Sequence, residues 1–155
     1  MFISYATKKG VEYLILIKRF LLMIQFLTRI PVPAILDSRN EDYGKGLVFA
    51  PMVGFIIGGI IAGLHLILKI IFPIYIAAIF DVLAYIILTG GIHIDGLGDT
   101  FDGLFSNSSK ERILEIMRDS RTGTNAVLSI TALMIVDTAF IAALGSMNMN
   151  KVLVM

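Results

Sequence analysis

Residues 47–68 read LVFAPMVGFIIGGIIAGLHLIL, an apolar run without a formal charge. A hydrocarbon core of about 30 Å is crossed by about 20 apolar residues in a helix, and this run is long enough. It also carries glycines at about one-turn spacing, at Gly54, Gly58, Gly59 and Gly63. Small residues on one face let another helix approach closely, although the spacing can also be incidental. The run therefore predicts a transmembrane helix.

Two further apolar runs are expected to span the membrane. One covers residues 70–89, with Pro73 near its start and Asp81 inside it, and the other covers residues 126–144 and contains Asp137. Acids within spans are functional candidates by default, but no motif supports either one here. His65, inside the first run, is expected to be a polar contact between helices.

The N-terminal residues 11–28 are apolar but differ from these runs. Lys18 and Arg19 lie near the middle, and a charged pair is costly at the centre of a span. We therefore expect an interfacial helix, which the prolines of Arg29–Pro33 bring to an end.

The composition of the whole chain agrees with a membrane protein. It is 57% hydrophobic and 16% charged, and its mean hydropathy is +0.86, whereas a soluble domain has about a quarter charged residues. The absence of cysteine excludes disulfides, cysteine-ligated metals and cysteine nucleophiles. A net charge of +1 argues against nucleic acid as a partner.

The distribution of basic residues predicts the topology. Seven Lys and Arg residues precede residue 47, one lies between the first two runs, and four lie between residues 89 and 126. The positive-inside rule places the N-terminal segment and the 90–125 segment on the cytoplasmic side. We expect one membrane domain over residues 1–155: an interfacial segment (1–46), a two-span hairpin (47–89), a cytoplasmic polar segment (90–125) and a third span (126–145).

Six of the twelve acidic residues fall between Asp95 and Asp119. Asp95, Asp99 and Asp102 share one face if the stretch is helical, and their mutual repulsion requires a positive group nearby. Oxygen ligands without cysteine suit a hard cation, Mg²⁺ or Mn²⁺. The glycines among these acids favour a close approach to phosphate, or a membrane helix broken around a polar site. The alternative is a solvated acidic loop.

The following residues predict an amphipathic helix at the membrane surface. Ser108 or Ser109 can cap this helix, and Gly123 can end it. Its charged face carries Arg112, Glu115 and Asp119, with Arg118 and Arg121 beside it. This pattern fits an ordinary solvated face. It fits equally well a site in which the arginines bind phosphate and the acids complete a metal site. His93, just before the acids, is either a hydrogen-bonding residue at a helix start or a contact to substrate phosphate.

These segments resemble the cobalamin synthase family, the adenosylcobinamide-GDP ribazoletransferases. The family signatures GGxHxDGLxDxxDG and EIM(K/R)DSRxG stand here as GGIHIDGLGDTFDG at residues 90–103 and EIMRDSRTG at residues 115–123. QFLTRIPVP at residues 25–33 and PMVG at residues 51–54 also match the family's N-terminal pattern. Family members are longer, so we expect this chain to correspond to an N-terminal portion and to transfer poorly by itself.

The resemblance implies an enzyme of the bacterial or archaeal cytoplasmic membrane. Its reaction joins adenosylcobinamide-GDP with α-ribazole or α-ribazole 5′-phosphate and releases GMP. The implied site has catalytic Asp95, Asp99, Asp102 and Asp119, a Mg²⁺ or Mn²⁺ ion on the first three, and substrate contacts from His93, Glu115, Arg118 and Arg121.

Two other functions fit the pattern. One is a phosphotransferase of the CDP-alcohol type that acts on membrane lipids, and the other is a membrane subunit that binds cations without catalysis. In each case further helices, or a second copy in a homo-oligomer, are expected to cover the glycine face and the intramembrane acids.

Overall fold

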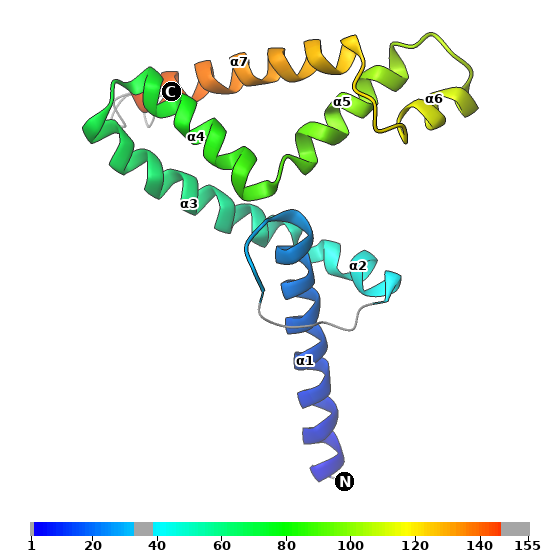
Figure 1. The fold of residues 1–155 in the computed structure, drawn as a ribbon. Coiled ribbons are helices and arrows are strands. Elements are labelled where there is room, and N and C mark those ends of the chain that lie inside the picture. The colour runs from blue at the N-terminus through cyan, green and yellow to red at the C-terminus, as the bar shows by residue number, and fades with distance from the viewer. Residues whose placement is uncertain (1, 33–38, 147–155) are drawn as a thin grey trace, which may run out of the picture. The chain divides into compact units, whose positions relative to one another are not determined.

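The computed structural model describes residues 2–32 and 39–146; Pro33, the last residue of the early motif, lies outside these ranges. All regular elements within them are helices, which confirms the prediction of an all-α protein (Figure 1). They are α1 (Phe2–Leu27), α2 (Asn40–Gly46), the 3-10 helix η1 (Leu47–Phe49), α3 (Ala50–Ile71), α4 (Ile74–Thr89), α5 (Ile92–Leu104), α6 (Lys110–Ile116) and α7 (Thr124–Ser146).

The chain forms two compact units. The first contains the residues up to Ile60 together with Leu88–Gly90, and the second contains Ile61–Ile87 together with the residues from Gly91 on.

In the first unit, α1 ends at Leu27, just before the predicted proline stop, and packs against α2. Asp42 of α2 lies beside the two cations in the middle of α1, with its oxygens 2.9 Å from Lys18 Nζ and 3.5 Å from Arg19 Nε. These contacts offset the charge that made α1 a poor candidate for a span. The helix is also longer than the apolar pattern indicated, since it begins at Phe2.

Among the described residues, two helical stretches are long and apolar enough to cross a membrane. They are the continuous run Asn40–Ile71, which contains α3, and α7. They correspond to the first and third predicted spans. The second predicted span differs, because Pro73 separates α3 from α4 and leaves α4 with 16 residues, about 24 Å of helix. It counts as a third candidate only together with α5.

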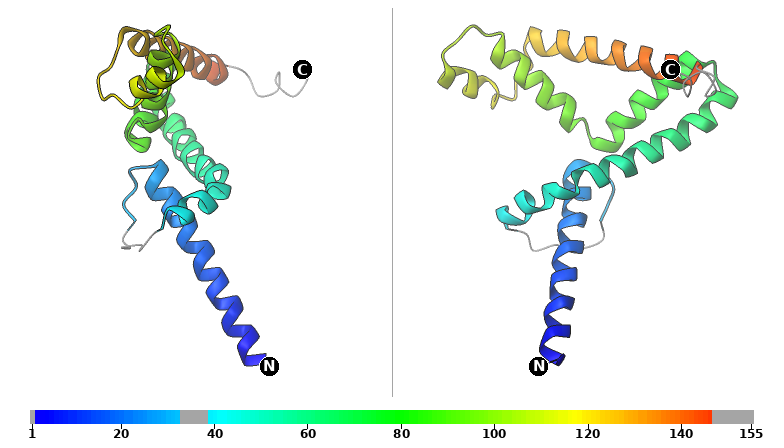
Figure 2. Two further views of the ribbon diagram at one scale, coloured as in Figure 1. Left: turned by 90° about the vertical axis from the view of Figure 1, so that its right-hand side faces the viewer. Right: turned by 180° about the vertical axis from the view of Figure 1, so that it is seen from behind.

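A bend of 90° separates α4 from α5. It occurs at Gly90 and Gly91, whose φ angles of +67° and +75° lie in the left-handed region that glycine adopts without steric cost. The bend at this glycine pair agrees with the second alternative for the glycines, a helix broken around a polar segment. After the bend, α5 packs on α7 and on α6 (Figure 2).

Within the second unit, His65 joins α3 to α4, as predicted. Its Nδ1 lies 2.6 Å from Oδ2 of Asp81, whose side chain has no exposed surface. The other carboxylate oxygen of Asp81 is buried and has no hydrogen-bond partner among the described residues.

The glycine face of α3 is open. A Cβ added at Gly54, Gly58, Gly59 or Gly63 would meet no described atom within 4 Å. The close helix contact predicted for this face is therefore not made by the described part of this chain.

Candidate functional site

The acidic residues lie on α5, which is helical as the shared-face argument required. Asp95, Asp99 and Asp102 consequently stand at i, i+4 and i+7 on neighbouring turns of one helix. Asp95 is exposed, and the other two are partly buried.

The glycines of α5 allow neighbouring helices to come close. A Cβ at Gly98 would lie 3.2 Å from Ala126 Cβ on α7, and a Cβ at Gly103 would lie 2.7 Å from Met117 Cγ. These two glycines therefore serve helix packing, a role that the sequence analysis did not assign to them. A larger residue at either position would push α7 or the end of α6 away from α5.

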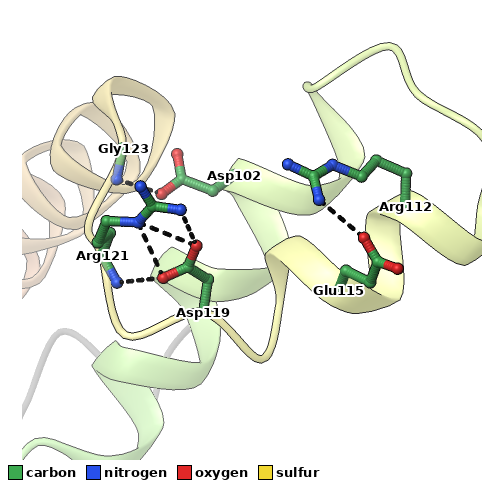
Figure 3. Close-up of polar contacts among 6 residues, drawn as sticks. All are labelled: Asp102, Arg112, Glu115, Asp119, Arg121 and Gly123. Carbon is green, nitrogen blue, oxygen red and sulfur yellow. Dashed lines mark hydrogen bonds and ion pairs between the residues drawn. The ribbon is translucent and has the colours of Figure 1, made fainter.

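Asp102 caps the beginning of α7. Its Oδ2 accepts a hydrogen bond from the Gly123 main-chain N–H at 2.5 Å (Figure 3). Its Oδ1 accepts one from the Ala126 N–H at 2.9 Å. The first N–H groups of a helix have no partner within the helix, so an oxygen acceptor there is stabilising. This role is not visible in the sequence, because the cap comes from a residue 21 positions away from Gly123 rather than from a neighbour.

The helix predicted to run to Gly123 is shorter than expected. α6 ends at Ile116, and residues 117–123 form an irregular segment, which we call the arginine loop. Ser109 does cap α6, with its Oγ accepting from the Arg112 N–H at 3.4 Å. The predicted face of Arg112, Glu115 and Asp119 is therefore wrong as a helical face, because Asp119 lies beyond the helix end.

Glu115 pairs with Arg112 at 2.7 Å, and both side chains are more than half exposed. An exposed pair of this kind contributes little to stability, which agrees with an ordinary solvated face for these two residues.

Arg121 and Asp119 form a pair within the arginine loop. Arg121 Nη2 donates to Oδ2 of Asp119 at 2.6 Å, Nε lies 3.0 and 3.1 Å from the two oxygens, and the Arg121 main-chain N–H also donates to Oδ1 (Figure 3). The hydrogen bonds and charge of Arg121 hold the pKa of Asp119 below its ordinary value, and the pKa of Arg121 is raised by the same contact. Both groups therefore stay charged at neutral pH.

The two other residues predicted to bind substrate are exposed. Arg118 lies in the arginine loop, and His93 lies in the first turn of α5 with its ring 6.3 Å from that of Tyr85.

The described residues contain no group of three or more His, Cys, Asp or Glu side chains arranged to hold a metal ion. The Asp102 carboxylate already accepts two main-chain hydrogen bonds, whereas the carboxylates of Asp95 and Asp99 have no hydrogen bond or ion pair to a described residue. Two carboxylates on adjacent turns still suit Mg²⁺, which is often held by one or two carboxylates together with substrate phosphates. The donor set thus fits a metal that shares its ligands with a phosphate.

Arg29 is a further residue that the site prediction missed. Its main-chain N–H donates to the Leu88 carbonyl at 2.7 Å, and its exposed side chain lies over Gly90, where any Cβ would collide with the guanidinium. The glycine pair at residues 90–91 was visible in the sequence, but nothing local indicated that an arginine would cover it.

Comparison with known proteins places these elements in a family. Residues 19–155 match the family described as cobalamin-5-phosphate synthase. The chain is 56% identical over 139 residues to an adenosylcobinamide-GDP ribazoletransferase of Acetivibrio thermocellus, covering 90% of this chain and 56% of the relative. It is 51% identical over 138 residues to a protein of the same name from Clostridium acetobutylicum, covering 89% and 55%.

A third relative of that name, from Clostridioides difficile, is 45% identical over 131 residues, covering 84% of this chain and 51% of the relative. The chain thus spans about half the length of the curated relatives it matches. No solved structure matches it. With a match that covers most of its length, including both charged signatures, the chain belongs to the cobalamin-5-phosphate synthase family.

Proposed function

We propose that the chain carries the polar site of an adenosylcobinamide-GDP ribazoletransferase in the cytoplasmic membrane. A ribose hydroxyl of α-ribazole, or of its 5′-phosphate, attacks the cobinamide-linked phosphate of adenosylcobinamide-GDP. A phosphodiester bond forms, the bond to the GMP phosphate breaks, and adenosylcobalamin or its 5′-phosphate is produced. Positioning and charge neutralisation supply most of the catalysis in such transfers.

The observation that carries the proposal is the junction of the two charged segments. Asp102 and Gly103 of α5 contact Gly123 and Met117, so the acidic helix and the arginine loop lie together although they are separate in sequence. A pyrophosphate needs both kinds of group, since cations bind its oxygens and carboxylates hold a metal or accept a proton.

In this site, the carboxylates of Asp95 and Asp99 are available to hold Mg²⁺ or Mn²⁺, whereas both carboxylate oxygens of Asp102 accept main-chain hydrogen bonds. The ion, when bound, neutralises charge on the leaving GMP phosphate. Arg118 is exposed and available to phosphate oxygens. Arg121 uses Nε and Nη2 for Asp119, which leaves the Nη1 side of its guanidinium for a phosphate.

The proton acceptor is best sought on α5. A general base works best when its pKa lies near the working pH, and Arg121 lowers the pKa of Asp119 away from that range. We therefore propose that Asp119 orients Arg121 and that a carboxylate of α5 accepts the hydroxyl proton. His93 remains a proposed contact to phosphate, and the role proposed for Glu115 is to orient the exposed side chain of its partner Arg112.

The experiment uses a chimera in which this chain replaces the matching half of the Acetivibrio thermocellus relative. The purified chimera in detergent is expected to release GMP from adenosylcobinamide-GDP and α-ribazole in the presence of Mg²⁺, and the chain alone is expected to do so poorly. A chimera carrying Asp99→Ala is the inactive control. A folded chimera that releases no GMP, or one that releases CMP from a CDP-linked lipid, would contradict the proposal.

A further inference from the structure

We infer that Asp102 is a positioning residue: with its neighbour Gly103 it fixes both ends of the arginine loop on α5, and this contact, rather than metal ligation, is the task of its carboxylate. The structural part of the inference stands on the contacts alone. Its consequence for catalysis rests on the proposed function.

The beginning of α7 lacks a cap from its own neighbourhood. Gly123 occupies the position just before Thr124, where a serine, threonine, asparagine or aspartate side chain commonly binds the first free N–H groups. Gly123 has no side chain to do so. Asp102 supplies the oxygens instead, one to the Gly123 N–H and one to the Ala126 N–H, and its negative charge lies at the positive end of the helix dipole.

The absence of a side chain at Gly123 leaves room for this carboxylate. A Cβ at this position would lie 2.6 Å from Oδ1 and 2.7 Å from Oδ2 of Asp102. A side chain at residue 123 would therefore expel the carboxylate from the end of α7. The aspartate in one signature and the glycine in the other form a single contact.

The other end of the arginine loop is held one residue further along α5. Met117, where the loop begins, packs over Gly103, and a Cβ at Gly103 would lie 2.7 Å from its Cγ and 3.3 Å from its Sδ. Adjacent residues of α5 thus hold the first and last residues of the loop. Arg118, Asp119 and Arg121 lie between these two anchors, so the position of the proposed phosphate-binding groups depends on the Asp102–Gly103 pair.

A positioning carboxylate and a metal ligand respond differently to substitution by asparagine. Asparagine keeps one oxygen acceptor and is a good helix cap, so Asp102→Asn should retain part of the contact, whereas Asp102→Ala should lose all of it. A metal ligand loses its charge in both variants and should fail equally in both. The order of the two variants therefore identifies the role.

The first measurement is amide hydrogen exchange at Gly123 and Ala126 in the detergent-purified chain, labelled with ¹⁵N-glycine and ¹⁵N-alanine and free of divalent ions. Exchange in Asp102→Ala is expected to be roughly fivefold faster, the factor that corresponds to a cap of about 1 kcal/mol. Asp102→Asn should fall between that variant and the unchanged chain. Asp99→Ala, one turn away on the same helix, is the matched control and should leave both amides unchanged.

The second measurement is Mn²⁺ binding to the same four proteins, followed by electron paramagnetic resonance. Asp99→Ala should weaken binding, and Asp102→Asn should retain it. Unchanged exchange at both amides in Asp102→Ala would overturn the inference, and so would a loss of Mn²⁺ affinity in Asp102→Asn as large as that in Asp99→Ala. Because neither measurement depends on turnover, a failure of the chimera to release GMP is distinguishable from a failure of this inference.

Discussion

Removing one member of the His65–Asp81 pair should destabilise the second unit far more than removing both. The His65 Nδ1 to Asp81 Oδ2 distance is 2.6 Å, the carboxylate is fully buried, and the exposed fraction of the imidazole is 16%. In His65→Ala, this buried carboxylate loses its sole hydrogen-bond partner among the described residues, because its Oδ1 already has none. The double variant His65→Ala/Asp81→Ala leaves no polar group unpaired.

The coupling energy expected between His65 and Asp81 follows from the burial of the pair. Breaking a buried pair costs about 3–5 kcal/mol, whereas hydrogen bonds between membrane helices average about 0.6 kcal/mol and reach about 1.7 kcal/mol. Because the Asp81 side chain has no contact with solvent, we expect a coupling energy of about 2–3 kcal/mol, between these two ranges. If His65→Ala loses about 2–3 kcal/mol, then at roughly 2–4 °C per kcal/mol it should lower Tm by about 4–12 °C.

The assay is unfolding of the four members of the cycle in detergent micelles, followed by circular dichroism during heating and during titration with sodium dodecyl sulfate. Asp137→Ala serves as the control for loss of an acid from an apolar helix, since Asp137 is half-buried on α7. A coupling energy at or below about 0.6 kcal/mol would refute the reasoning, because the pair would then be no stronger than an ordinary contact between membrane helices.

Four further predictions concern the polar segment. Asp99→Ala should relieve like-charge repulsion, so the free energy of unfolding without metal should hold or rise by about 0.2–0.5 kcal/mol in thermal unfolding. GMP release by the chimera should fall about 100-fold in the same variant. Near-normal release with unchanged Mg²⁺ dependence would argue against a metal role for Asp99. Arg121→Lys keeps the positive charge but loses the planar guanidinium that can donate two parallel hydrogen bonds to phosphate. The variant should therefore raise the KM for a substrate and leave Tm nearly unchanged. An unchanged KM for both substrates would favour a purely solvated loop. A cysteine at Ser108, the single thiol in the chain, should be labelled from the cytoplasmic side of sealed vesicles, and labelling from the outer side alone would reverse the topology. The contact with Arg121 lowers the pKa of Asp119 below its ordinary value of 3.8. The stability that the Asp119–Arg121 pair contributes should therefore be fully present above pH 3.8 and be lost as the pH falls through the lowered pKa. A carboxyl ¹³C titration of Asp119 with its midpoint at or above 3.8 would contradict this pairing.

The sequence predicted the helices well because membrane helices are dictated by composition over about 20 residues. The apolar runs at residues 47–68 and 126–144 lie in helical stretches long enough to span, and α1 ends just before the Arg29–Pro33 stop. The acidic stretch is helical, so its three carboxylates have the predicted spacing. These features depend on chain chemistry within a few residues: hydropathy, proline, and the i, i+4 relation.

The errors share a different cause. The sequence predicted that a helix ends at Gly123, but this residue lies just before the start of α7. The cap of α7 comes from Asp102, and a pattern among neighbouring residues cannot reveal a partner so distant in sequence. The packing role of two glycines of α5 was also invisible in the sequence, because Gly98 and Gly103 make room for α7 and Met117, which are distant along the chain. In each case the partner is a side chain or helix brought close by folding.

Sequence alone therefore determined the all-helical membrane class, the positions of the apolar helices and, through its two signatures, the family. Tertiary structure decided which polar groups meet: Lys18 with Asp42, His65 with Asp81, and Asp102 with the Gly123 main chain, across separations of 24, 16 and 21 residues. The physical reason is the range of the forces involved. Hydropathy and helix geometry act between near neighbours, whereas a hydrogen bond requires two atoms within about 3 Å, and only the packing of helices brings distant residues that close.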